Sequence, residues 1–88
     1  MSAAEAAPRI ELLTKPGCHL CDVAREVIDI VCAESGDDWI ETSIEDDPAL
    51  YDEYWEKIPV VLVDGRPHEY WRVNPERLRA ALREPAVR

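Results

Sequence analysis

The sequence predicts a single α/β domain of the α+β type, in which helices flank a four-stranded mixed sheet. Short apolar runs typical of strands alternate with segments whose apolar residues recur every three or four positions. An Asp-Pro pair and an Asn-Pro pair mark helix starts, and an Asp-Gly pair marks a hairpin turn. The element order is therefore β-α-β-α-β-β-α. The chain has 88 residues, enough for one core, so we expect one domain over residues 1–88 with an ordered core at about 9–84 and short tails.

The first strand and helix are predicted from the N-terminal third of the chain. Residues 9–14 indicate a short buried strand that ends at Pro16-Gly17. From Cys18 to about Glu34 the pattern indicates an amphipathic helix, which Ser35-Gly36-Asp37 ends with a glycine stop. The residues that form its apolar face are Leu20, Val23, Ala24, Val27, Ile30 and Val31.

A second strand and helix follow. Residues 39–44 alternate between apolar and polar side chains, which indicates a strand. Asp47-Pro48 combines an N-cap with proline at the first helical position. The helix that it opens carries Leu50, Tyr51, Tyr54 and Trp55. The first strand, helix and second strand form a parallel unit with a right-handed crossover.

The last third of the chain predicts a hairpin and a closing helix. Val60–Val63 indicates a third strand, and the turn signal Asp64-Gly65 leads into a fourth strand at His68–Val73. Asn74-Pro75 repeats the cap-plus-proline start. Leu78, Ala81 and Leu82 give this last helix its buried face, and Pro85–Arg88 forms a tail. The antiparallel hairpin makes the sheet mixed.

Composition excludes several classes of function. The net charge of −9 argues against binding to nucleic acid or to an anionic membrane surface, and it is compatible with a basic protein partner. The apolar run Pro59–Val63 is too short to span a bilayer. Met1–Arg9 has neither a basic nor a strongly apolar region, so we expect no signal peptide and a cytoplasmic location. Nothing in the pattern favours an obligate dimer, and we expect a monomer.

Cys18-His19-Leu20-Cys21 is a C-x-x-C motif at the junction of the first strand and helix. Two residues one helical turn apart lie about 5–6 Å from each other, within reach of a disulfide. The N–H groups at the helix start and the charge of Lys15 favour the thiolate of Cys18, the form that attacks disulfides. Cys32 lies about 16 Å along the helix from Cys21, too far for a disulfide, so we expect a small core residue, with a regulatory thiol as the alternative.

The motif Lys15-Pro16-Gly17-Cys18-His19-Leu20-Cys21, an Ile58-Pro59 before the third strand, and this element order resemble the thioredoxin fold and, within it, the glutaredoxins. The resemblance covers roughly Ile10 to Leu82 and is nearest to short glutaredoxin-like proteins. It implies a small cytosolic dithiol–disulfide oxidoreductase that serves electron transport and cell redox homeostasis.

The same resemblance implies roles for individual residues. Cys18 is expected to attack and Cys21 to resolve the mixed disulfide, while Lys15 and His19 tune the thiolate. Pro59 matches the cis-proline of the fold, beside which the backbone at Ile58 would offer an edge to a substrate peptide or thiol.

The glutathione-binding pattern of glutaredoxins differs from this chain after the fourth strand. Glutaredoxins have a Gly-Gly pair and an Asp there, whereas this chain has Val73-Asn74-Pro75-Glu76. Arg72 or Arg77 and the start of the last helix are left as carboxylate-binding candidates. We expect no required cofactor, and glutathione, another low-molecular-weight thiol and a protein disulfide all stay open as co-substrates.

Two other functions remain open from the residues. The C-x-x-C pair, with His19 as a third ligand or with a second chain, could hold a metal ion or an iron–sulfur cluster. The fold could also be an interaction module without turnover. The aromatic residues are expected to pack in the core, with one of Tyr70 and Trp71 facing away, and His68 is expected to be a solvated strand residue.

Overall fold

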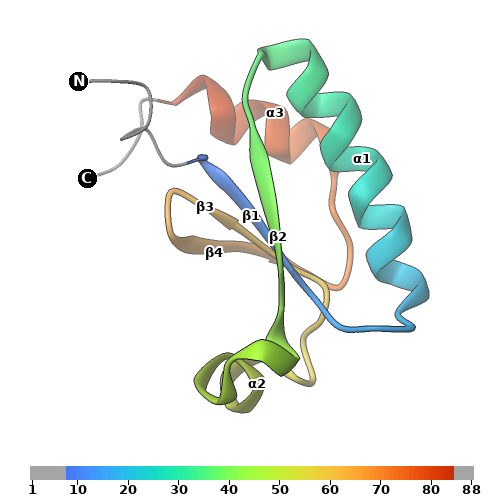
Figure 1. Ribbon diagram of the computed structural model, residues 1–88. Helices are drawn as coiled ribbons and strands as arrows, with labels where there is room; N and C mark the ends of the chain where they lie inside the picture. Colours follow the sequence, from blue (N-terminus) through green and yellow to red (C-terminus); the bar gives the residue numbers. More distant parts are fainter. Residues whose placement is uncertain (1–7, 85–88) are drawn as a thin grey trace.

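A computed structural model describes residues 8–84, in which four strands form one mixed sheet flanked by helices (Figure 1). The elements in chain order are β1 (Ile10–Thr14), α1 (His19–Ser35), β2 (Trp39–Ser43), the 3₁₀ turn η2 (Ile44–Asp46), α2 (Pro48–Tyr54), β3 (Val60–Val63), β4 (Arg66–Tyr70) and α3 (Pro75–Arg83). The strand order is β2-β1-β3-β4, with β1 parallel to β2, and β3 antiparallel to both β1 and β4. The predicted α+β class and element order are confirmed. The expected tail Pro85–Arg88 lies outside the described residues.

Helix α1 starts and ends within one residue of the predicted positions. Cys18 is its N-cap, in extended backbone conformation. Gly36 ends the helix with φ +81°, and its N–H donates to the Cys32 carbonyl at 2.8 Å. A left-handed residue after the last turn favours glycine. These two caps fix the register of α1 and therefore the direction in which both motif cysteines project.

Strand β4 differs from its predicted span His68–Val73. Asp64 and Gly65 both have positive φ, as a two-residue hairpin turn requires, so pairing resumes at once with Arg66 opposite Val63. A bulge between Val61 and Leu62 shifts the register, and the strand ends at Tyr70. Trp71 has φ +67° and leaves the extended conformation. The left-handed conformation of Trp71 therefore ends the strand three residues earlier than the apolar pattern predicts.

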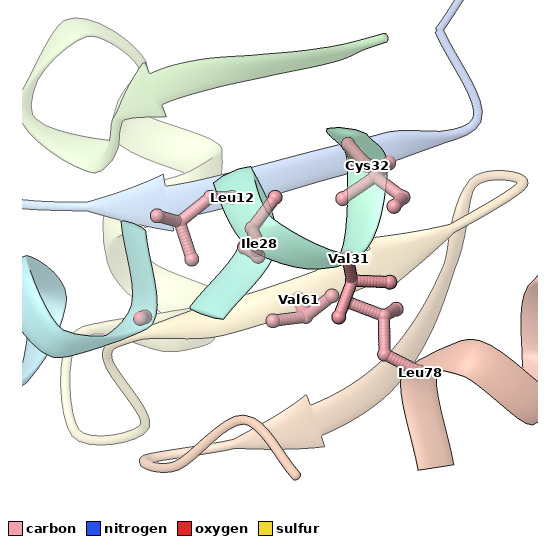
Figure 2. Close-up of a cluster of buried hydrophobic side chains, with 8 residues drawn as sticks. Leu12, Ile28, Val31, Cys32, Val61 and Leu78 are labelled. Atoms are coloured by element: carbon pink, nitrogen blue, oxygen red, sulfur yellow. The ribbon is translucent and has the colours of Figure 1, made fainter. Parts of the chain in front are cut away.

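Two buried clusters hold the sheet and helices together. Helices α1 and α3 cover one face of the sheet, where the larger cluster lies (Figures 1 and 2). Its members are Ile10, Leu12, Ala24, Ile28, Val31, Cys32, Val61 and Leu78. The second cluster lies nearer α2, which contributes Leu50 and Tyr54 to it. Its buried members are Leu13, Cys21, Ile44, Ile58 and Val60.

The buried face of α1 is rotated relative to the predicted one. Leu20, Val23 and Ile30 are 43%, 57% and 57% exposed, although the pattern placed them on the apolar face. Of the predicted face, Ala24 and Val31 are buried, and the other buried residues of the helix are Cys21, Ile28 and Cys32. Both stripes satisfy helical spacing, and the packing of α3 and the sheet selects the one centred on Ile28. The expectation that Cys32 is a small core residue is confirmed.

Several residues outside α1 also differ from expectation. Tyr51 and Trp55, which were expected in the core, are exposed, and so are both Tyr70 and Trp71, of which only one was expected to face away. Both Tyr70 and Trp71 are exposed, because Trp71 lies beyond the end of β4 and does not alternate with Tyr70. His68 is half-buried and its Nε2 is buried without a hydrogen-bond partner among the described residues, so the expectation of a solvated side chain was wrong. Over residues 8–84, the longest apolar helical stretch falls short of what a membrane crossing requires.

Candidate redox site

Cys18 is placed by the start of α1. Its Sγ accepts a hydrogen bond from the backbone N–H of Cys21, with an N···S distance of 3.2 Å. The N-terminus of a helix has free N–H groups and a partial positive charge, and both stabilise an anion. Cys18 is half-buried and lines a groove at the surface. The geometry therefore places the Cys18 sulfur at the start of the helix and beside a groove from which a disulfide can approach it.

Cys21 lies one helical turn further and is fully buried. Burial, and then its hydrogen bond to the Cys18 side chain, raises the pKa of the Cys21 thiol to about 12. The backbone N–H of Lys15 and the charge of Arg25 act in the opposite direction and are outweighed. At neutral pH Cys21 is a protonated thiol. This asymmetry supports the predicted order, in which Cys18 attacks first and Cys21 acts second.

A groove of about 410 Å³ opens beside Cys18. The connection from β1 to α1, the first turns of α1 and strand β2 form its walls. Lys15 and His19, the two predicted thiolate-tuning residues, line it together with Cys18. His19 is exposed and Lys15 half-buried. The structure thus brings the thiol and both cationic candidates to one groove.

The far wall of this groove carries an ion-pair network that the sequence did not predict. Arg25 donates from Nε and Nη2 to the two carboxylate oxygens of Glu41, each at 2.7 Å, and it also pairs with Asp22. The buried Thr14 hydroxyl donates to Oε2 of Glu41 at 2.9 Å. The hydrogen bond from Arg25 lowers the pKa of Glu41. The wall therefore stays charged at neutral pH and joins α1 to β1 and β2.

Part of this network could have been found from the sequence. Arg25 follows Cys21 by four residues, so helical spacing alone places the two on the same side of α1. Glu41 could not have been found, because its position depends on the pairing of Leu12 with Glu41 in the parallel register of β1 and β2.

Cys18 also packs against the second buried cluster. Cys18, Cys21 and Ile58 pack in the same cluster, to which Tyr54 of α2 also contributes. The Ile58–Pro59 peptide bond is cis, as the resemblance implies, and both residues are buried. Within the described residues, Ile58 takes part in no strand pairing, since β3 begins at Val60. The structure thus brings the Ile58 backbone and both cysteines to one region.

Arg72, the remaining predicted site residue, lies in a neighbouring groove rather than in the groove beside Cys18. This second groove has a volume of about 300 Å³ and lies between α1 and the connection from β4 to α3. Its lining residues are Leu20, Val23, Ala24, Trp71, Arg72 and Val73. Arg72 is exposed and forms no ion pair with another described residue. Its carboxylate-binding role stays a prediction.

The difference between the thiols predicts an alkylation pattern. Near neutral pH, iodoacetamide should modify Cys18 at least about tenfold faster than Cys21 or Cys32, because alkylation requires an accessible thiolate. Burial raises the pKa of Cys32 to about 11, so both slow thiols should react faster as the pH rises, by about tenfold per unit while they remain mostly protonated. Peptide mapping by mass spectrometry measures the three rates. Equal rates at Cys18 and Cys21 would contradict the proposed geometry.

The thiols and their neighbours do not form a metal site among the described residues. In the stretch from residue 8 to residue 84, no three His, Cys, Asp or Glu side chains gather closely enough to hold a metal ion.

Comparison with known proteins gives a consistent result. Residues 9–83 match the family described as Glutaredoxin-like domain (DUF836). The chain is 38% identical over 80 residues to Uncharacterized protein Rv0508 of Mycobacterium tuberculosis, which covers 85% of this chain and 82% of the relative. The X-ray structure of protein XcR50 from X. campestris superposes with a TM-score of 0.71 at 33% identity, covering 86% of this chain and 99% of that one.

A solution structure of protein Ne2328 from Nitrosomonas europaea also superposes, with a TM-score of 0.72 over 84% of this chain and 91% of that one. At 18% identity this second likeness concerns the fold alone. The four-stranded mixed sheet, the C-x-x-C pair at the start of α1 and the family match agree: the chain has a thioredoxin-like fold and belongs to the glutaredoxin-like family.

Proposed function

We propose that this protein is a small thiol–disulfide oxidoreductase that exchanges electrons through a reversible Cys18–Cys21 disulfide. The observation that carries the proposal is the arrangement of the two thiols. The Cys18 sulfur caps α1 at the edge of an open groove, and the buried Cys21 thiol lies one turn away in the same cluster. An accessible attacking sulfur next to a protonated resolving thiol is what two-step disulfide exchange requires.

In the first step the Cys18 thiolate attacks one sulfur of a substrate disulfide. A bond forms between that sulfur and Cys18, the substrate S–S bond breaks, and the leaving thiolate takes a proton from solvent. In the second step Cys21 loses its proton and attacks the Cys18 sulfur, which releases the other half of the substrate as a thiol. The substrate gains two electrons, and the protein is left with a Cys18–Cys21 disulfide.

Formation of the mixed disulfide also prepares the second step. Two of the influences that raise the pKa of Cys21 come from Cys18, namely its side-chain hydrogen bond and its charge. Both end when Cys18 is bonded to the substrate sulfur. The Lys15 backbone N–H and the Arg25 charge remain, and they favour the Cys21 thiolate. The resolving thiol is therefore expected to become easier to deprotonate only after the first step.

Return to the dithiol form requires an external reductant of the thiol class. Glutathione or another low-molecular-weight thiol would fit the groove beside Cys18, where Lys15 and His19 could meet its carboxylates. A protein disulfide would instead approach along the backbone at Ile58. The proposal suits a cytoplasmic location, where thiols are kept reduced.

Oxidation of the reduced protein by a small disulfide, followed by mass spectrometry, tests this proposal. We expect each chain to reduce one disulfide, release two thiols and lose two hydrogens, with the new bond mapped to Cys18 and Cys21. Purified protein that carries stoichiometric zinc or an iron–sulfur cluster and forms no such bond would contradict it and favour the metal-binding alternative.

A further inference from the structure

We propose that an aromatic and acidic surface beside the thiols docks Lys- or Arg-rich segments of protein substrates. This surface is formed by η2, α2, the connection from α2 to β3, and residues 70–72 at the end of β4 and just beyond it. The inference rests on the proposed oxidoreductase function and names its substrate class: a protein disulfide flanked by basic residues.

This surface carries four exposed aromatic residues, which are Tyr51, Trp55, Tyr70 and Trp71. Tyr51 and Trp55 are 41% and 49% exposed, and they lie one helical turn apart at the end of α2. Tyr70 and Trp71 form an edge-to-face pair with ring centroids 6.0 Å apart. The Trp71 indole N–H donates to the carbonyl of Glu56 at 3.0 Å, which joins this pair to the segment that follows Trp55.

Trp71 is held in place in a strained backbone conformation. A bulky residue at φ +67° is rare, and such strain persists only where the surroundings enforce it. Its backbone N–H donates to the Pro59 carbonyl at 2.7 Å, in addition to the indole bond to Glu56. The ring is nevertheless 53% exposed. A fixed, exposed tryptophan is a strong contact residue for a partner, since little side-chain entropy is lost on binding.

The charge of this surface selects the partner. The stretch from residue 45 to residue 56 carries six acidic residues and no basic one, and the basic residues of the surface are Lys57 and Arg72. The acidic residues are Glu45, Asp46, Asp47, Asp52, Glu53 and Glu56. None of them takes part in an ion pair among the described residues. Exposed aromatic rings among unpaired carboxylates complement a cationic chain, through both charge and cation–π contacts.

Lys57 already lies against two aromatic rings of this surface. The Lys57 Nζ lies 5.5 Å from the centroid of the Tyr70 ring and 6.0 Å from that of Tyr54. Both distances are within the range of a cation–π contact. Lys57 therefore shows how the ammonium group of a partner lysine would be received by the neighbouring rings.

The surface is continuous with the thiols. Tyr54 and Ile58 pack in the cluster that contains Cys18 and Cys21, and the Pro59 carbonyl accepts the bond from Trp71. Figure 1 shows α2 at the end of the sheet where β1 leads into α1, which is the end that carries the motif. A chain bound across the aromatic residues would thus place a neighbouring disulfide near Cys18.

Exchange kinetics with two peptides test the inference. Each peptide carries one cysteine in a mixed disulfide with a chromogenic thiol, flanked by Lys and Arg in one peptide and by Glu and Asp in the other. We expect the basic peptide to react at least about tenfold faster at low salt. An uncharged small disulfide, measured in parallel, reports the intrinsic reactivity of Cys18.

Paired variants separate this surface from the overall charge of the protein. Asp52→Asn with Glu53→Gln should reduce the preference for the basic peptide by about three- to tenfold. Asp37→Asn with Asp38→Asn removes the same charge at the far end of β2 and should leave most of the preference in place. Equal losses in the two variants would overturn the docking surface and leave the oxidoreductase function standing.

A binding measurement tests the docking surface even if the protein does not exchange disulfides. If even the small disulfide fails to react, the proposed function fails, and docking is judged by titrating a cysteine-free basic peptide into the protein labelled for NMR. Chemical-shift changes confined to Tyr51, Trp55, Tyr70 and Trp71 would support the surface, and unchanged shifts there would overturn it.

Discussion

Replacing Cys18 by serine is expected to remove disulfide exchange, with a loss of at least about a thousandfold. A serine hydroxyl stays protonated at neutral pH and cannot replace the thiolate as nucleophile. Cys21 cannot substitute, because it is fully buried and its pKa is raised to about 12. The measurement is turnover of a small disulfide by a variant whose unfolding transition matches that of the parent protein. Full activity in Cys18→Ser would contradict the assigned role.

Two further cysteine variants complete this test. Cys21→Ser should keep part of the first step and accumulate a mixed disulfide at Cys18, which mass spectrometry detects as the parent mass plus one substrate half. Cys32→Ala is the matched control, because Cys32 packs in the larger cluster with Ile28 and Val31 and away from the motif. Its turnover should equal that of the parent protein. A loss of turnover in Cys32→Ala would assign Cys32 a part in the reaction.

Ile28→Ala is expected to destabilise the domain by about 2–5 kcal/mol, which is the usual cost of a cavity left by a buried large aliphatic side chain. Ile28 projects from α1 and is completely buried in the larger cluster, with residues of the sheet and of α3 (Figure 2). A small domain has a total stability of about 5–15 kcal/mol, so the loss is a large share of the whole. Urea unfolding followed by circular dichroism measures it.

Ile30→Ala is the matched control for Ile28→Ala. Ile30 lies on the same helix two residues later and is 57% exposed. Its replacement should change stability by no more than about 0.5–1 kcal/mol. The comparison also decides between the two stripes of α1, because the sequence pattern placed Ile30 on the apolar face and the structure places Ile28 there. A larger effect at Ile30 would mean that α1 is rotated toward the stripe that the pattern predicted.

Local signals made the fold largely predictable. The cap-and-proline starts at Asp47-Pro48 and Asn74-Pro75, the stop at Gly36 and the hairpin turn at Asp64-Gly65 each depend on a few neighbouring residues. All of these element ends lie where the sequence predicted them. Helix ends and tight turns depend on the conformational preferences of a few neighbouring residues, so they can be predicted without knowledge of the tertiary structure.

Features that depend on tertiary packing were not predictable. Both stripes of α1 obey the same helical period, so only contacts with α3 and the sheet could select Ile28 over Ile30. The end of β4 is set by the left-handed backbone of Trp71, which bonds to Pro59 and Glu56 from another part of the chain. The aromatic residues could not be recognised as a surface until α2 was seen to cover only one end of the sheet (Figure 1).

The candidate site divides in the same way. Lys15, Cys18 and His19 lie within five residues of one another in the chain and line one groove, with Cys21 buried one helical turn beyond Cys18. Arg72 was chosen because it lies near the start of the last helix, where a carboxylate was expected to bind, and it lies in a separate groove with Trp71. The Arg25–Glu41 network crosses from α1 to β2 and needs the strand register to be known.

The reduction potential of the Cys18–Cys21 pair tests the central claim most directly. The protein would be equilibrated in thiol/disulfide buffers of defined potential, and the reduced and oxidised forms counted by mass spectrometry. We expect one reversible two-electron transition at about −270 to −180 mV, between the values typical of thioredoxin and of protein disulfide isomerase. Failure to form a reversible Cys18–Cys21 disulfide at any potential would contradict the oxidoreductase function.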